Sequence, residues 1–150
     1  VVSSTAVPAN AWSFVAMTHQ AVGEDLKLFI GDEDTPVAEV AYTTLISGVG
    51  VQAGDATDSL WIGNSGDTTR TFDGRIFDVR AWDELVLSVP EFTRVQRGAL
   101  ARPGPANVKV WLMLFGVASP ETDYSGNANN GTVTGATNSG LTPGGYGWIR

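Results

Sequence analysis

The sequence predicts an all-β fold, a two-sheet antiparallel sandwich of jelly-roll type with one short helix near residues 88–97. Eighteen glycines and seven prolines occur among 150 residues, which indicates frequent turns rather than long helices. Short apolar runs alternate with polar residues at every second position, the pattern of strands with one buried face. A chain of this length builds one hydrophobic core, so we expect a single domain over residues 1–150.

The composition argues against several functional classes. The chain has no cysteine, which excludes disulfides and thiolate chemistry and leaves the compartment open. A formal net charge of -7 argues against nucleic-acid binding, which needs a basic surface. No window approaches the roughly 18 apolar residues of a membrane-spanning helix. The chain begins Val1-Val2 rather than with Met, so we expect a processed product, a fragment or a trimmed chain.

The first part of the chain is predicted to form short strands. Residues 1–8 form an edge strand that ends at Pro8. Residues 11–19 carry apolar side chains on both faces, and such a strand belongs inside a sandwich. One face holds Trp12, Phe14 and Ala16, and the other holds Ser13, Val15 and Met17. Residues 26–30 alternate as well and complete a hairpin with this strand, and residues 37–42 add another strand.

The other elements are arranged around residues 60–82. Residues 60–62 are apolar and end at the turn signal Gly63-Asn64, so they are predicted to form a strand. A polar loop follows, and Phe72 is expected to re-enter an apolar environment. Residues 75–82 alternate, which predicts an antiparallel strand with one wet face. Phe77, Val79 and Ala81 share the inner face, and Asp78 and Arg80 share the wet one.

The last part of the chain holds the helix start and the most hydrophobic segment. Ser88 and Glu91 have the spacing of a capping box, and Pro90 suits a first helical turn. The predicted helix stops at Gly98, and an extended linker follows. Residues 107–115 are apolar on both faces, which predicts a central strand or one covered by a partner. The remainder is glycine-rich and polar, typical of loops and short edge strands.

Five segments together resemble the laminin-G-like domains of the concanavalin A-like superfamily. In order they are WSFVAMT at 12–18, LKLFI at 26–30, LWIGN at 60–64, FDGRIFDVR at 72–80 and LSVPE at 87–91. They match the family patterns W-x-x-V-A, L-x-L-(F/Y)-(I/V)-x-G, I-G, F-x-G-x-I-x-x-V-R and L-S-x-x-E. Two features depart from the pattern: the usual D-G after the second strand is Gly31-Asp32 here, and the family's opening strand is not found at the N-terminus.

The C-terminal segment offers a candidate for that opening strand. Residues 110–134, with DYSGNANNGTV at 123–133, are similar to the beginning of these domains, an apolar strand followed by D-x-S-G-N-x-N-x-G. Three alternatives follow: the segment closes its own sandwich, begins a second truncated copy, or completes a neighbouring subunit by strand addition. In the first, residues 106–150 are a permuted closing strand with a glycine-rich tail.

The sequence offers no convincing catalytic group. The resemblance includes glycoside hydrolases, whose catalytic strand reads E-x-D-x-x-E, with carboxylates that share one face. Asp32-Glu33-Asp34 instead lies in a predicted turn, and the run from Asp78 to Glu84 is interrupted by Arg80 and Trp82. His19 is the sole histidine, so no multi-histidine metal site exists. We therefore expect no enzyme activity, and a glycoside hydrolase is the least favoured hypothesis.

Binding is the favoured function, because the resemblance implies ligand recognition through loops, sometimes with Ca²⁺. Candidate calcium ligands are Asp55, Asp58, Asp67 and Asp73. The alternative is that these aspartates are turn residues on a solvated acidic face. The candidate ligand-binding residues, which would contact a glycan or a protein surface, are Trp61, Asn64, Arg70 and Trp82. One or both tryptophans instead belong to the core in the alternative interpretation.

Two functional classes remain. The first is a non-catalytic recognition or surface-assembly module outside a cell, as in secreted adhesins. The second is a structural virion protein, a capsid decoration or fibre subunit, held by strand exchange with its neighbours. In that case a homo-oligomer or larger assembly would form through the strand at 107–115. The expected location is extracellular or the virion surface, with no membrane insertion.

Overall fold

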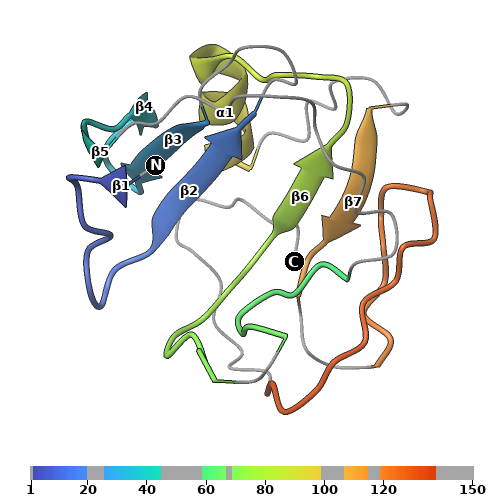
Figure 1. Cartoon of the computed structure of the whole chain (residues 1–150). Helices are drawn as coiled ribbons and strands as arrows, with labels where there is room; N and C mark the ends of the chain where they lie inside the picture. The colour runs from blue at the N-terminus through green and yellow to red at the C-terminus, as the bar shows by residue number, and fades with distance from the viewer. Residues whose placement is uncertain are drawn as a thin grey trace. The chain divides into compact units, whose positions relative to one another are not determined.

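The computed structural model describes residues 2–19, 26–44, 59–66, 69–98, 107–114 and 119–137 (Figure 1). The chain divides into two compact units, and each is described by itself. Unit 1 comprises Val1–Gln52, Glu84–Pro103 and Thr142–Arg150, and unit 2 comprises Ala53–Asp83 and Gly104–Leu141. All described strand pairs are antiparallel, and the described residues include one short helix. The predicted all-β class is therefore confirmed.

A three-stranded sheet forms the centre of unit 1. It consists of β2 (Ser13–Thr18), β3 (Lys27–Asp32) and β4 (Ala38–Glu39), in that order. β2 and β3 pair without interruption, from Ser13 opposite Asp32 to Thr18 opposite Lys27. The structure therefore contains the hairpin predicted from the alternating pattern of the two segments.

A second, smaller sheet in unit 1 joins the predicted first strand, at residues 1–8, to the end of the predicted fourth strand, at residues 37–42. It pairs β1 (Val2–Ser3) with β5 (Tyr42–Thr44), so the strand predicted at 37–42 is split between β4 and β5. The Tyr42 hydroxyl accepts a hydrogen bond from the Leu28 amide at 3.0 Å and donates one to Glu39 at 3.0 Å. Desolvation raises the pKa of this phenol above its ordinary value. The side chain thus ties β5 to β3 and β4.

The helix α1 (Val89–Gln96) begins where the capping box predicted. The Glu91 carboxylate accepts hydrogen bonds from the Ser88 amide at 2.7 Å and the Ser88 hydroxyl at 2.6 Å. The Ser88 hydrogen bonds lower the pKa of Glu91, because they favour its charged form. On the buried side of the helix, the Phe92 ring packs 5.0 Å from the Phe29 ring and 6.2 Å from the Phe14 ring. α1 therefore covers one face of the β2–β3 sheet (Figure 1).

The last helical residue ties α1 to the turn after β3. The Gln96 side chain donates to the carbonyls of Asp32 and Thr35, at 2.6 Å and 2.7 Å, and accepts from the Val37 amide at 2.9 Å. Gly31 permits this approach, because a Cβ there would lie 2.7 Å from the Gln96 amide nitrogen. The turn is thus held by a residue about sixty positions away in the sequence.

The other face of β2 differs from the prediction. Val15 and Met17 were expected inside a sandwich, but 57% and 61% of their surfaces are exposed. The alternation of β2 is real, since Phe14 faces α1 and Val15 faces away. Only one face of the strand is covered by the described part of the chain.

Unit 2 is built on an antiparallel pair, β6 (Val79–Trp82) and β7 (Val108–Leu112). β7 lies within the predicted strand at 107–115. A further segment is bridged to β7 between Leu112 and Asp123, and it is closed on itself by a bridge between Glu121 and Gly131. The strand predicted at 60–62 is wrong, because these residues form no regular strand.

The predicted wet face of residues 75–82 is also wrong. The side chains of Asp78 and Arg80 are 2% and 6% exposed and form a buried ion pair. Regular strand structure begins only at Val79, and Asp78 has a positive φ of 54°. The period-two pattern therefore does not extend through Asp78, and the carboxylate turns toward Arg80 instead of solvent.

Candidate functional site

The candidate site is the aromatic loop, defined here as residues 60–66 and 69–76 of unit 2. Its two halves are joined by a hydrogen bond of 2.8 Å from the Phe72 amide to the Gly63 carbonyl. Gly63 has a positive φ of 82°, and a Cβ there would lie 3.2 Å from the Ile76 side chain. Glycine therefore suits both the conformation and the close packing of this turn.

Two aromatic rings of this loop are largely exposed. Trp61 is 57% exposed, and Phe72, which was expected in an apolar environment, is 56% exposed. Each ring lies against a glycine: a Cβ on Gly66 would be 3.0–3.5 Å from three indole atoms, and one on Gly74 would be 2.7 Å from the Phe72 ring. The bare backbone of each glycine thus supports its ring. Both rings present aromatic surface to solvent.

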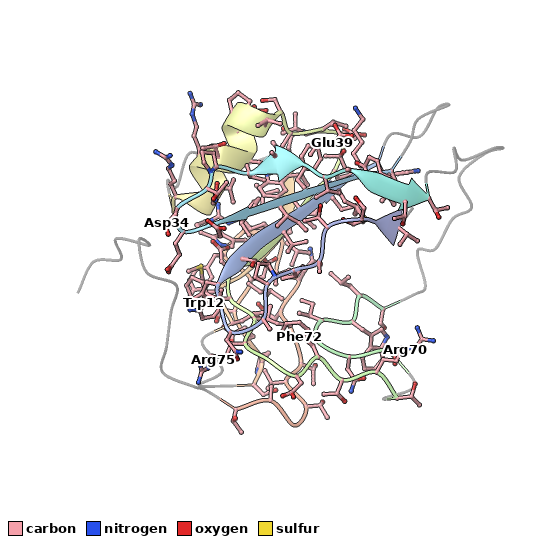
Figure 2. All side chains as sticks on the ribbon, turned by 90° about the vertical axis from the view of Figure 1, so that its left-hand side faces the viewer. Trp12, Asp34, Glu39, Arg70, Phe72 and Arg75 are labelled. Atoms are coloured by element: carbon pink, nitrogen blue, oxygen red, sulfur yellow. The ribbon has the colours of Figure 1, made fainter. Side chains whose placement is uncertain are left out.

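Polar groups of the loop lie close to these rings in the chain. The side-chain oxygen of Asn64 accepts a hydrogen bond from the Ser65 amide at 2.8 Å, which leaves its NH₂ group as a donor. Arg70 and Arg75 are exposed and form no ion pair with the described residues. Figure 2 shows both guanidinium groups extending outward from the chain.

The other predicted ligand-binding residue, Trp82, belongs to a different environment. It lies in β6 opposite Val108 and is half-buried. Its indole N–H is buried and has no hydrogen-bond partner among the described residues. The structure therefore groups Trp61, Asn64 and Arg70 in one loop and places Trp82 in the sheet.

The calcium prediction falls mainly outside the described residues. Asp55, Asp58 and Asp67 are not among them, and Asp73 is exposed in the aromatic loop. Within the described ranges, no three His, Asp or Glu side chains are grouped closely enough to hold a metal ion. A calcium site at these four aspartates stays a prediction.

The buried ion pair is a feature that sequence reasoning missed. Arg80 donates to both Asp78 carboxylate oxygens, at 2.8 Å and 2.7 Å, and the Trp111 indole N–H donates to the same carboxylate at 3.0 Å. The guanidinium also lies 4.5 Å from the centroid of the Trp111 ring, which packs against Tyr124. The sequence Asp78-Val79-Arg80 places an acid and a base two residues apart, and this spacing could have indicated the ion pair. All three donors satisfy the carboxylate, which suits a structural role.

A second missed feature is the polar loop centred on Asp123. Its buried carboxylate accepts hydrogen bonds from the amides of Trp111, Ser125 and Asn129 at 2.8–2.9 Å and from the Ser125 hydroxyl at 2.8 Å. Burial raises the pKa of this carboxyl, but the hydrogen bonds from Ser125, Trp111 and Asn129 outweigh it, so the pKa lies below its ordinary value. Asp123 therefore joins the loop to β7 as a carboxylate.

The side-chain amides of this loop complete the attachment to β7. Asn127 donates to the Val108 carbonyl at 2.7 Å, and Asn129 donates to the Lys109 carbonyl at 2.7 Å. The Tyr124 amide donates to the Trp111 carbonyl at 2.8 Å. The D-x-S-G-N-x-N pattern is thus a device for binding the edge of a strand.

Comparison with known families identifies the fold. A laminin-G model of the concanavalin A-like lectin/glucanases superfamily matches residues 1–91. The chain belongs to this family. The match agrees with the predicted resemblance and with an all-β sandwich. Searches of the curated proteins and of the solved structures found no match.

Membership defines the class of function. Laminin G-like domains are binding modules for proteins or glycans, usually without catalytic activity and typically outside the cell. No helix in the described ranges is both long and apolar enough to cross a membrane.

Proposed function

We propose that this protein is a non-catalytic recognition module that binds glycans through its aromatic loop, outside a cell. The observation that carries the proposal is the pair of exposed rings, Trp61 and Phe72, each seated on a glycine. The face of an aromatic ring is electronegative, and the C–H groups of a sugar face are weakly electropositive. Exposed aromatic rings thus suit sugar faces.

The spacing within the loop suits a short oligosaccharide. Trp61 is two residues from Gly63, which is hydrogen-bonded to Phe72. At about 3.5 Å per residue and about 5 Å across a hydrogen-bonded pair, the two Cα atoms lie within roughly 12 Å of each other. The Asn64 amide and the Arg70 guanidinium supply donors for hydroxyl or carboxylate groups of the same ligand.

The proposal is tested with a printed array of neutral and acidic oligosaccharides, followed by calorimetry with the best-bound glycan. Trp61→Ala and Phe72→Ala should each weaken binding about tenfold, the loss of about 1.4 kcal/mol of stacking energy. Gly74→Ala should weaken it as well, because the new Cβ displaces the Phe72 ring. Tyr124→Ala is the matched control, since it removes a half-exposed aromatic ring of unit 2 that lies outside the loop.

Two results would overturn the proposal. One is an array without any bound glycan at protein concentrations of about 100 μM, since weak glycan contacts lie within this range. The other is equal binding by wild type and both alanine variants. Loss of binding in EDTA would instead show that calcium contributes, and would support the four predicted aspartates as its ligands.

A structural virion role through strand exchange at 107–115 has less support. One edge of β7 is paired with β6, and the other receives hydrogen bonds from residues 123–129. A partner strand would have to displace one of these sets. The same bonds support the alternative in which this segment is a permuted closing strand of its own domain.

A further inference from the structure

We infer that Asp73-Gly74 is a site of spontaneous isoaspartate formation, and that the fold protects the chemically more reactive pair Asn130-Gly131 from the same reaction. These are the two places in the chain where Asp or Asn directly precedes glycine. Such pairs cyclise because glycine has no Cβ to shield its amide nitrogen and adopts backbone conformations that other residues rarely reach. The structure leaves one pair unrestrained and holds the other by hydrogen bonds.

The reaction is the same at both pairs except for the group that leaves. The glycine amide nitrogen attacks the side-chain carbonyl carbon of the preceding residue, and the new N–C bond closes a five-membered succinimide ring. The leaving group carries away the amide proton, as water from Asp73 or as ammonia from Asn130. One water then opens the ring. Attack at the side-chain carbonyl gives aspartate, and attack at the main-chain carbonyl gives isoaspartate.

The intrinsic chemistry favours Asn130-Gly131. At neutral pH an amide loses ammonia more readily than a carboxylate loses water, because the carboxylate must first take up a proton. In an unfolded chain we therefore expect Asn130 to react before Asp73. Any reversal of this order in the folded chain is an effect of the structure.

No contact with the described part of the chain restrains Asp73-Gly74. Both residues are exposed, in a stretch of the aromatic loop without regular secondary structure. Among the described residues, neither of them takes part in a hydrogen bond or an ion pair. The Gly74 nitrogen can therefore approach the Asp73 carboxyl group without breaking any described hydrogen bond.

Both reacting groups of Asn130-Gly131 are engaged instead. The Gly131 amide donates to the Glu121 carbonyl at 2.9 Å, and the Asn130 side-chain oxygen accepts from the Asp123 amide at 2.9 Å. A further bond of 2.7 Å, from the Glu121 amide to the Gly131 carbonyl, closes the bridge. Asn130 therefore cyclises only when this loop opens, and its rate falls with the population of the opened loop.

Isoaspartate at position 73 changes the aromatic loop itself. The main chain then runs through the side-chain carbons of Asp73, which adds one carbon between Phe72 and Gly74. The Phe72 ring packs so closely on Gly74 that a Cβ there would lie 2.7 Å from it. The modified loop loses this packing, whatever its rings bind. The net charge stays the same, because isoaspartate keeps one carboxylate.

The inference is tested by incubating the full chain at neutral pH and mapping its peptides by mass spectrometry, with isoaspartate labelled by protein isoaspartyl methyltransferase. In the folded chain the label should appear at Asp73 before Asn130 shows either the label or the mass gain of deamidation. In guanidinium chloride the order should reverse. Deamidation at Asn130 should be at least about tenfold slower in the folded chain than in the denatured one, a factor that corresponds to about 1.4 kcal/mol.

The variant Asp73→Asn compares the two places with identical chemistry, because asparagine then precedes glycine at both. In the folded variant, deamidation at position 73 should be about tenfold or more faster than at Asn130, and in denaturant the two rates should be similar. Asn127→Ala removes a hydrogen bond of 2.7 Å to the Val108 carbonyl and loosens the protected loop. It should speed deamidation at Asn130 and leave the rate at Asp73 unchanged, so Asp73 is the internal control.

Four results would overturn the inference. They are a folded wild type that forms no isoaspartate at Asp73, one in which Asn130 reacts first, the same order of reaction in folded and denatured chains, and an Asp73→Asn variant that reacts no faster at position 73 than at Asn130. None of them bears on glycan binding by the unmodified aromatic loop, so the two proposals fail separately.

Discussion

β2 and β7 are both short apolar strands, yet their edges are treated in opposite ways. β7 is paired with β6 on one edge and bonded by Asp123, Asn127 and Asn129 on the other. β2 is paired on one edge and has no described partner on the other. The difference lies in the polar residues that follow β7, and not in the hydrophobicity of either strand. In these two segments the apolar run predicted the strand, while distant hydrogen-bonding residues decide whether its edge is open.

Among these predictions, loss of the buried ion pair between Asp78 and Arg80 should destabilise the protein most. Arg80→Ala leaves the Asp78 carboxylate buried and uncompensated, and such changes cost about 3–5 kcal/mol of unfolding free energy. Urea denaturation checks this, with Arg75→Ala, an exposed arginine of the same unit, as the control. The double variant Asp78→Ala/Arg80→Ala should lose less than the sum of the two single variants. Equal stability of Arg80→Ala and wild type would contradict the structural role.

Removing the Asp123 carboxylate should have the next largest effect. Asp123→Ala leaves the Trp111 and Asn129 amides without their acceptor, and we expect a loss of about 2–4 kcal/mol. Asp34→Ala, an exposed acid that points outward in Figure 2, is the control. The Asp123 variant should also speed the exchange of β7 amides, which would make β7 resemble β2. Unchanged exchange would show that the loop does not protect that edge.

Low pH should also weaken the attachment of the Asp123 loop to β7. The pKa of Asp123 is lowered in the folded state, so its contribution is complete above the ordinary value of 3.8 and is lost as the pH falls through the folded pKa. The gap in stability between wild type and Asp123→Asn should therefore be widest near neutral pH and shrink below about pH 3.8. Urea titrations across this range measure it. A gap independent of pH would contradict the lowered pKa.

The smallest change in stability is expected for a substitution on the exposed face of β2. Val15→Thr keeps a β-branched residue on the exposed face of β2, so the free energy of unfolding should change by less than about 0.5 kcal/mol. Phe14→Ala, on the helix-covered face of the same strand, is the contrasting variant and should cost about 3 kcal/mol or more. Similar losses for both would show that the two faces of β2 are equally buried.

Local chemistry explains which parts of the fold the sequence could predict. The capping box of α1 and the β2–β3 hairpin depend on neighbours in the chain, and both are present. The family motifs likewise led to the correct superfamily. The predictions that failed concerned features set by backbone conformation or by residues far away in the sequence. The positive φ of Asp78 ended the alternating pattern, so its burial with Arg80 was not visible.

Residue type led to the candidate site, and ligand binding there stays a prediction. Trp61, Asn64 and Arg70 were singled out by residue type, and the structure finds them in one loop. Phe72 was expected to be buried, because nothing in its apolar character shows that Gly74 would hold its ring at the surface. Trp82 lies in the sheet and not in the loop, as in the interpretation that assigned a tryptophan to the core. Its partner strand β7 lies far away in the sequence, so this placement was not visible from neighbouring residues.

The bond between Gln96 and the turn after β3 also bears on how the protein is made. During synthesis, β2, β3 and β4 leave the ribosome well before Gln96. Until α1 follows, the apolar face of this sheet stays uncovered and the turn after β3 lacks its hydrogen bonds to Gln96. The family match ends at residue 91, inside α1. A fragment cut at that boundary would carry every strand of the early sheet without Gln96, and we expect it to be retained by chaperones or degraded, whereas one extended past Gly98 should accumulate.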